Sequence, residues 1–273
     1  MKSKIYILTY NRAKLLNITL RGLFESDAKP FIDSGDCEVF IINNHSNIHI
    51  DGQFKEKVTL LNNVLRPDFS TGHIGRNWNQ ALILGFESLS TPMSDLVITL
   101  QDDVLVQPDW YTKLKKLHFE KNLNFVQNGH GDALCSYTPE AVKKVGLWDE
   151  RFIFGLQASD YFYRQLMFNW DGCTINDPVH TRSHNPLHQN EMTATTYLVA
   201  NSFYAETFPD PSFDINIASS IIKEKYHHQS QLHPWTETNK QAAKVDKFKG
   251  NSYIFYPYFE KDIYELKEKK YVL

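Results

Sequence analysis

The sequence predicts an α/β protein in which helices flank a mostly parallel sheet, with a C-terminal region appended to it. Short apolar runs of the kind found in buried parallel strands alternate with segments whose apolar residues recur at helical spacing. The expected strands are Ile5–Leu8, Val39–Ile42, Val58–Leu61, Leu96–Leu100 and Ala133–Tyr137. Such alternation favours a parallel sheet. A chain of 273 residues is also long enough to bury a substantial core.

The expected helices follow these strands along the chain. They cover residues 16–24, 79–88, 108–117, 138–146 and 159–168. Pro108 suits the first turn of its helix, where proline is well tolerated. The pattern loosens after about residue 190, with prolines, a His227-His228 pair and a charged, aromatic tail. We therefore expect one domain over residues 1–190 and an extension over residues 191–273 that packs on it or adds a partner surface.

Composition excludes several classes of protein. The net charge of −3 gives no basic face for nucleic acid. The three cysteines are widely spaced and form no Cys-x-x-Cys pair, which argues against a disulfide framework or a zinc site. No apolar run approaches the roughly 18 to 20 residues of a membrane-spanning helix, and the N-terminus lacks a signal-peptide pattern. We expect a cytoplasmic protein, soluble or peripherally associated, whose oligomeric state the sequence leaves open.

Polar segments follow three of the expected strands. They are Thr9-Tyr10-Asn11-Arg12, Asn43-Asn44-His45-Ser46 and Gln101-Asp102-Asp103. Ligands of open α/β sheets bind beyond the carboxyl ends of the strands, so these segments should converge on one rim. An aspartate pair that ends a buried strand is costly to desolvate without positive charge, and a divalent cation is a natural partner. Taken alone, the pair is equally compatible with a solvated turn or a helix cap.

Further motifs agree in order with a known family. They are Gly72-His73-Ile74-Gly75-Arg76-Asn77, Pro108-Asp109-Trp110, Trp148-Asp149-Glu150-Arg151-Phe152 and Asp160-Tyr161-Phe162-Tyr163-Arg164. Together with the three polar segments, they resemble the GT-A glycosyltransferases, especially the inverting family-2 type, over residues 3–190. The resemblance implies a GT-A (Rossmann-like) fold. It also implies transfer of a hexosyl or pentosyl group from a nucleotide-diphosphate donor, with a UDP-sugar as the working choice, to a hydroxyl of a glycan or glycoconjugate, with inversion and with Mn²⁺ or Mg²⁺ as cofactor.

The resemblance also assigns residues. Those implied to bind the nucleotide sugar are Thr9, Tyr10, Asn11, Arg12, Asn43, Asn44, Arg76, Asn77 and Asp102. Asp103 is the implied metal ligand, with His180 or His184 completing the site. The implied catalytic base is Asp160, with Asp149 and Glu150 as alternatives. An acid at the Asp160 position is equally explained as a stabilising residue of the first helical turn.

The chain departs from the family pattern at several positions. Asn43 replaces an aspartate, Gln101 replaces the first acid of the Asp-x-Asp motif, and Gln157 with Ala158 occupies the usual place of the base. These departures keep open a domain that binds a nucleotide or glycan without turnover. A nucleotidyltransferase is the other alternative, although it generally needs a glycine-rich loop after the first strand, and residues 9–12 contain no glycine.

Overall fold

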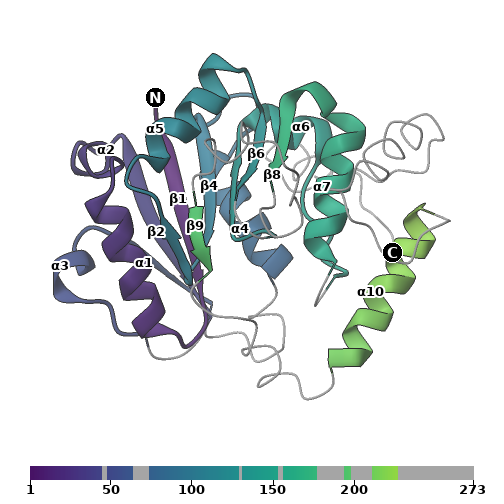
Figure 1. Cartoon of the computed structure of the whole chain (residues 1–273), viewed down its shortest axis with the longest axis horizontal. Helices are drawn as coiled ribbons and strands as arrows, with labels where there is room; N and C mark the ends of the chain where they lie inside the picture. Colours follow the sequence, from purple (N-terminus) through teal and green to yellow (C-terminus); the bar gives the residue numbers. More distant parts are fainter. Residues whose placement is uncertain are drawn as a thin grey trace, which may run out of the picture.

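The computed structural model describes residues 1–44, 48–63, 74–128, 131–152, 156–176, 194–197 and 211–226 (Figure 1). A seven-stranded sheet with the order β3-β2-β1-β4-β7-β6-β8 forms its centre. The strands are β1 (Ser3–Thr9), β2 (Cys37–Asn43), β3 (Thr59–Asn62), β4 (Leu96–Gln101), β6 (Phe125–Asn128), β7 (Leu134–Tyr137) and β8 (Cys173–Asn176). Only β7 runs antiparallel to its neighbours in this sheet, so the predicted mostly parallel arrangement is confirmed.

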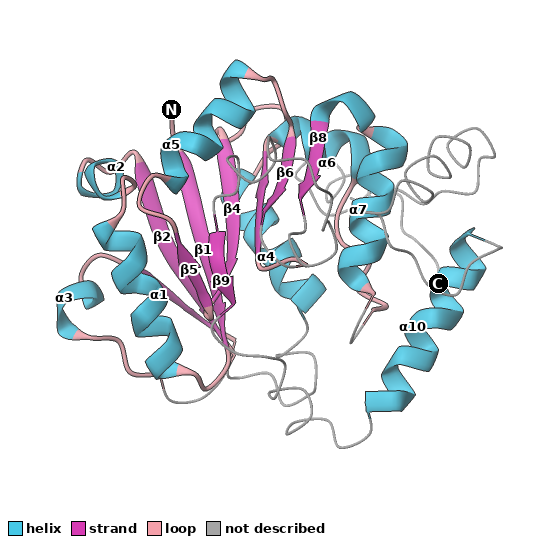
Figure 2. Ribbon diagram, in the orientation of Figure 1, coloured by secondary structure: helices cyan, strands magenta, loops and turns pink. Residues whose placement is uncertain are grey.

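Helices cover the sheet, as the ribbon in Figure 2 shows. They are α1 (Ala13–Glu25), α2 (Lys29–Asp33), α3 (Gly52–Lys55), α4 (Ile74–Phe86), α5 (Trp110–Lys115), the π-helix η2 (Lys116–Glu120), α6 (Pro139–Val145), α7 (Gln157–Phe168), the 3₁₀ helix η3 (Trp170–Gly172) and α10 (Pro211–Tyr226). None of the helices in the described ranges is both long and apolar enough to cross a membrane.

The core is divided between the two faces of the sheet. Side chains alternate across β1, so Ile5 and Ile7 join a cluster with α1 and α5, while Tyr6 joins a cluster with α4, α6 and α7. Strand β4 divides in the same way, with Val97 on the α4 side and Ile98 on the α1 side. The expected helices are present, and α4 begins at Ile74, earlier than its apolar spacing indicates.

Strands outside the predicted set complete the structure. Besides β6 and β8, a short strand β5 (Val104–Val106) pairs antiparallel with β9 (Ala194–Tyr197) in a separate two-stranded sheet. From the C-terminal region, α10 packs against the α4 side of the core through Ala218, Ile222 and Tyr226. The Tyr226 ring lies 4.9 Å from that of Tyr163 on α7.

Candidate functional site

The strand register aligns the polar segments at the carboxyl edge of the sheet. Thr9 pairs with Asn43, and Asn43 pairs with Asn62 on the next strand. On the other side of β1, Leu8 pairs with Gln101, so the aspartates after β4 lie level with the segment after β1. The predicted convergence on one rim is therefore observed for residues 9–12, 43–44 and 101–103. His45 and Ser46 lie outside the described residues.

Side chains after β1 contact the aspartate pair directly. Thr9 Oγ1 donates a hydrogen bond to Asp102 Oδ2 at 2.6 Å. Arg12 Nη1 lies 3.1 Å from Asp103 Oδ2 and 3.8 Å from Asp102 Oδ1. Between Thr9 and Arg12 the backbone turns through Asn11, whose φ of 52° is left-handed, a conformation that asparagine adopts more readily than most residues. The first loop thus brings a hydroxyl and a cation to the two carboxylates.

Both carboxylates are almost completely buried. Burial raises the pKa of Asp102 to about 7, against the opposing effect of the Thr9 hydrogen bond. Burial also raises the pKa of Asp103, against the opposing charge of Arg12. Asp103 Oδ1 is buried and has no hydrogen-bond partner among the residues that the structure describes. A buried carboxylate oxygen without a partner is costly, and it is the kind of ligand that a hard divalent cation takes.

The described residues contain no complete metal site. Within them, no group of three or more His, Cys, Asp or Glu side chains is arranged to hold an ion. The candidate ligands His180 and His184 lie outside the described residues. The chemistry of the Asp103 carboxylate fits Mn²⁺ or Mg²⁺, because both prefer oxygen ligands.

A third acid, which the sequence analysis did not identify, lies beside the pair. Asp132 is buried just before β7 and accepts hydrogen bonds from Gln101 Nε2 at 3.0 Å and from Trp78 Nε1 at 2.8 Å. Its charge contributes to the raised pKa of Asp103. Gln101, which replaces the first acid of the family motif, therefore connects a neighbouring carboxylate to the rim.

Amide side chains occupy the part of the rim formed by β2 and β3. Asn43 Nδ2 donates to Asn62 Oδ1 at 2.9 Å. Asn63 Nδ2 lies within hydrogen-bonding distance of Asn44 Oδ1 (3.1 Å) and Asn77 Oδ1 (3.2 Å). Asn62 and Asn63 were missed, yet the rule that identified Asn43 applies to them, since they also end a strand at this edge. This network links the predicted residues Asn43, Asn44 and Asn77.

The first turns of α4 connect the rim to the segment after α6. Arg76 Nε donates to Glu150 Oε2 at 3.1 Å, and Asn79 Nδ2 donates to Glu150 Oε1 at 2.9 Å. Asn79 also exchanges hydrogen bonds with the backbone of Trp148. The α4 helix therefore holds Glu150 beside Arg76 and Asn79.

The three predicted acids of the catalytic region differ in exposure. The side chain of Glu150 is 37% exposed, whereas that of Asp149 is 1% exposed and that of Asp160 is fully enclosed. Asp149 accepts from Arg151 Nη2 at 2.8 Å, and Asp160 accepts from Arg164 Nε at 3.0 Å. Arg151 and a buried lysine of α10 outweigh the effect of burial and lower the pKa of Asp149 to about 2.

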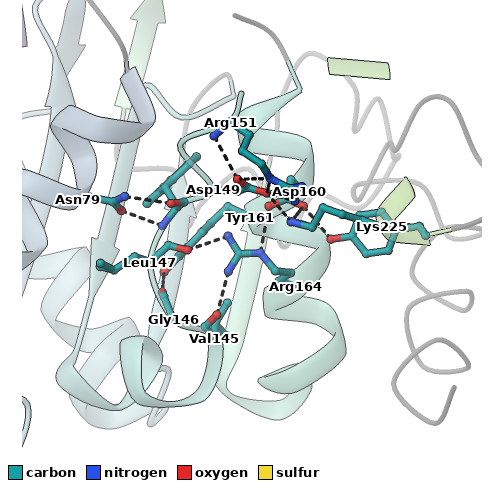
Figure 3. A network of polar contacts seen from close by, with 12 residues as sticks. Asn79, Val145, Gly146, Leu147, Asp149, Arg151, Asp160, Tyr161, Arg164 and Lys225 are labelled. Atoms are coloured by element: carbon teal, nitrogen blue, oxygen red, sulfur yellow. Dashed lines mark hydrogen bonds and ion pairs between the residues drawn. The ribbon is translucent and has the colours of Figure 1, made fainter. Parts of the chain in front are cut away.

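The buried arginine beside Asp160 has a structural role that the sequence did not reveal. Arg164 is completely buried, and its Nη1 and Nη2 donate to the carbonyl oxygens of Val145 and Leu147, each at 2.8 Å (Figure 3). These carbonyls belong to the last residue of α6 and to the segment just after it, so the Asp160–Arg164 pair fastens α7 to the segment that leads into Trp148 and Glu150.

Solved structures share this architecture. S. aureus TarS aligns with 92% of this chain and 44% of its own, at 10% identity and a TM-score of 0.51. S. aureus TarS 1-349 in complex with UDP-GlcNAc aligns over 91% of this chain and 72% of its own, at 9% identity and a TM-score of 0.50. The mannosyltransferase PcManGT from Pyrobaculum calidifontis, in complex with GDP-Man and Mn²⁺, aligns over 98% of this chain and 79% of its own, at 14% identity and a TM-score of 0.49.

A scan against protein-family models and a sequence search of curated proteins returned no match. The structural likeness at such low identity defines the fold: the chain has the GT-A fold that glycosyltransferases use. It spans 44% of the length of S. aureus TarS.

Proposed function

We propose that this chain is a metal-dependent glycosyltransferase that moves a sugar from a nucleotide-diphosphate donor to a hydroxyl of a glycan or glycoconjugate, with inversion. The buried Asp102–Asp103 pair is the observation that carries the proposal. It ends β4 at the edge where three parallel strands present polar side chains, and one oxygen of Asp103 lacks a partner among the described residues. A site of this kind suits an anionic ligand together with a divalent cation.

The nucleotide is assigned to the side of the rim formed by β1, β2 and β3. Amides of Asn43, Asn44 and Asn63 present both donors and acceptors, which is what the edge of a pyrimidine base requires. Asn44 Nδ2 is buried without a hydrogen-bond partner in the described part of the chain, so it is a donor available to a ligand. A UDP-sugar is the proposed donor, with Asp102 toward the ribose and Arg12 and Arg76 toward the phosphates.

Asp103 is the proposed ligand for Mn²⁺ or Mg²⁺, with His180 or His184 as a further ligand. When bound, the ion supplies positive charge that offsets the charge growing on the departing diphosphate. Thr9 and Arg12 hold the two carboxylates in place through their contacts with Asp102 and Asp103.

Glu150 is the proposed base. It is the acid of the three whose side chain reaches the surface, while Asp149 and Asp160 are enclosed by cationic partners. Glu150 accepts the proton of the acceptor hydroxyl as that oxygen attacks the anomeric carbon, and the bond to the diphosphate breaks on the opposite side. Arg76 and Asn79 orient the carboxylate. Asp149 and Asp160 are then positioning residues of this region.

A donor screen tests the proposal. The full chain is heated with each of a panel of nucleotides and nucleotide sugars, with and without Mn²⁺, because a ligand of the native state raises the melting temperature. We expect stabilisation by one nucleotide class that depends on Mn²⁺, followed by consumption of the corresponding sugar donor. Pyrophosphate release from a nucleoside triphosphate and a sugar phosphate would instead identify a nucleotidyltransferase. Binding without consumption of any donor would identify a domain that only binds.

A further inference from the structure

The penultimate residue of helix α10 is a lysine that is completely buried against two acids. Lys225 Nζ lies 3.0 Å from Asp149 Oδ2 and 2.5 Å from Asp160 Oδ1, and its side chain is 0% exposed (Figure 3). The next residue, Tyr226, donates its hydroxyl to Asp160 Oδ1 at 2.8 Å. The contact between Lys225 and Asp149 joins positions 76 residues apart in the chain.

The lysine occupies a position that helical spacing gives to an apolar side chain. Over residues 216–226 of α10, whose side chains the structure describes, the buried residues are Ala218, Ile222, Lys225 and Tyr226, and their spacing places them on one face of the helix. The neighbouring Lys223 and Glu224 are exposed, so the burial is specific to this face. Lysine is rarely buried completely unless it is paired. A buried ion pair often adds no net stability over apolar packing, but it does fix the geometry of the groups that it joins.

The geometry fixed here is that of the turn carrying Glu150. Asp149 is adjacent to Glu150, and it is held by Lys225 on one side and by Arg151 on the other. Asp160 is held by Lys225 and by Arg164, whose guanidinium also binds the carbonyls before this turn. Lys225 therefore connects Asp149, which directly precedes the partly exposed Glu150, to Asp160 on α7.

We propose that α10 is a docking element for the acceptor side of the site and that Lys225 is a positioning residue, which orients the turn of residues 149–151 and thereby the Glu150 carboxylate. This inference rests on the proposed function, in which Glu150 accepts the acceptor proton. Lys225 acts through Asp149 and Asp160 and has no role in binding the nucleotide, which is assigned to the edge formed by β1, β2 and β3.

Lys225→Met tests the inference, with Lys223→Met as the matched control on the exposed face of the same helix. Hydrogen exchange is measured over residues 148–152 and α10, together with donor affinity and the kcat and KM of transfer. We expect faster exchange in both segments for Lys225→Met alone. We also expect kcat to fall by about 10- to 100-fold, since small misplacement of a reacting group has effects of this size, while donor affinity stays within about twofold.

A second variant guards against loss of folding. Lys225→Met combined with Asp149→Asn removes one charge of each sign, and its kcat should be no lower than that of Lys225→Met alone, because the lysine acts partly through Asp149. Unchanged exchange in Lys225→Met would overturn the docking role. Faster exchange with unchanged kcat, or an equal loss of donor affinity, would overturn the positioning role. Failure of the parent chain to bind any donor would overturn the proposed function, while the exchange measurement would still report on docking.

Discussion

The acids of the site differ in chemistry because their surroundings differ. Burial raises the pKa values of Asp102 and Asp103, and the neighbouring carboxylates raise them further against the opposing charge of Arg12. Asp149 is buried against two cations, so its pKa is lowered. Glu150 keeps contact with solvent. In the proposed function, these surroundings suit the same functional group to three roles: holding a cation, fixing a turn and exchanging a proton.

Glu150→Gln keeps the shape and the hydrogen-bonding oxygen of the side chain but cannot accept a proton. We expect kcat for transfer to fall by about 10² to 10⁴, the range for loss of a general base, with little change in donor affinity. Steady-state kinetics with a glycan acceptor measures both. Glu140→Gln, on α6 with a side chain 48% exposed, is the control and should behave as the parent. Equal activity of the two variants would rule out Glu150 as the base.

Asp132→Asn changes an acceptor of two hydrogen bonds into a group with only one acceptor oxygen. Either Trp78 or Gln101 then faces an amide N–H, so we expect a loss of about 1 to 3 kcal/mol in the free energy of unfolding. Urea denaturation measures the change. Asp171→Asn, at an exposed position, should leave the midpoint unchanged. If the urea midpoint of Asp132→Asn equalled that of the parent, this acid would not hold the rim together.

The low pKa of Asp149 predicts a dependence of stability on pH. The pKa of Asp149 in the folded protein is about 2, against an ordinary value of 3.8. Its contribution to the free energy of unfolding is therefore complete above about pH 4, and it is lost as the pH falls from about 4 through 2. The contribution is about 2 kcal/mol. The free energy of unfolding in urea should fall less between pH 5 and pH 2.5 for Asp149→Asn than for the parent. An identical fall in the free energy of unfolding for both proteins would show that Asp149 is not held as a paired carboxylate.

At the scale of elements, α4 organises the site. Successive residues of its first turns contact Glu150, Asn63, Asp132 and the backbone of Trp148, and its buried face packs on the sheet. In the proposed function, the position of α4 against β4 therefore sets the distance between the nucleotide side and the acceptor side.

Gly85→Ala tests this packing. A Cβ at Gly85 would collide with Val97 Cγ2 on β4, so the helix must shift although alanine is the better helix former. We expect a loss of about 1 to 3 kcal/mol in the free energy of unfolding, the usual cost of overpacking. Gly52→Ala in α3 meets no atom within 4 Å and is the control, expected to be neutral or slightly stabilising. A parental midpoint for Gly85→Ala would contradict the close contact.

The strands whose prediction located the polar rim contain a short apolar run that is largely buried. Strands β1, β2 and β4 show this pattern, and polar residues follow the run in each of them. Strands β6 and β8 end in polar residues such as Gln127 and Asn176, and each has only four residues, so no periodicity marks them. They form because neighbouring strands supply their partners, which is information that local sequence does not contain.

Local sequence pattern and contacts between distant segments also separate the predicted from the missed site residues. Thr9, Asn43 and Asp102 follow strands, so topology alone brings them together. Asp132 and Lys225 reach the site through contacts between distant segments, and no spacing in the sequence connects them to it. The predicted roles of His180 and His184 stay predictions, since these residues lie outside the described ranges.

At the scale of the whole molecule, the proposed function assigns different tasks to two regions. The strands β1 to β4 are proposed to carry the nucleotide and metal side, and α6, α7 and α10 the acceptor side (Figure 1). The ion pairs of Lys225 with Asp149 and Asp160 fasten α10 to the second region. Changes in the C-terminal extension should therefore alter transfer to the acceptor more than binding of the donor.

Calorimetric titration of UDP into the full chain tests the central claim most directly. The titration is run with Mn²⁺, with a chelator in place of Mn²⁺, and with Asp103→Asn in the presence of Mn²⁺. The account predicts binding to the parent with Mn²⁺ and affinity at least about tenfold weaker in the other two cases, since Asp103 would hold the ion whose positive charge offsets that of the diphosphate. Absence of binding in every case, or undiminished affinity in Asp103→Asn, would contradict it.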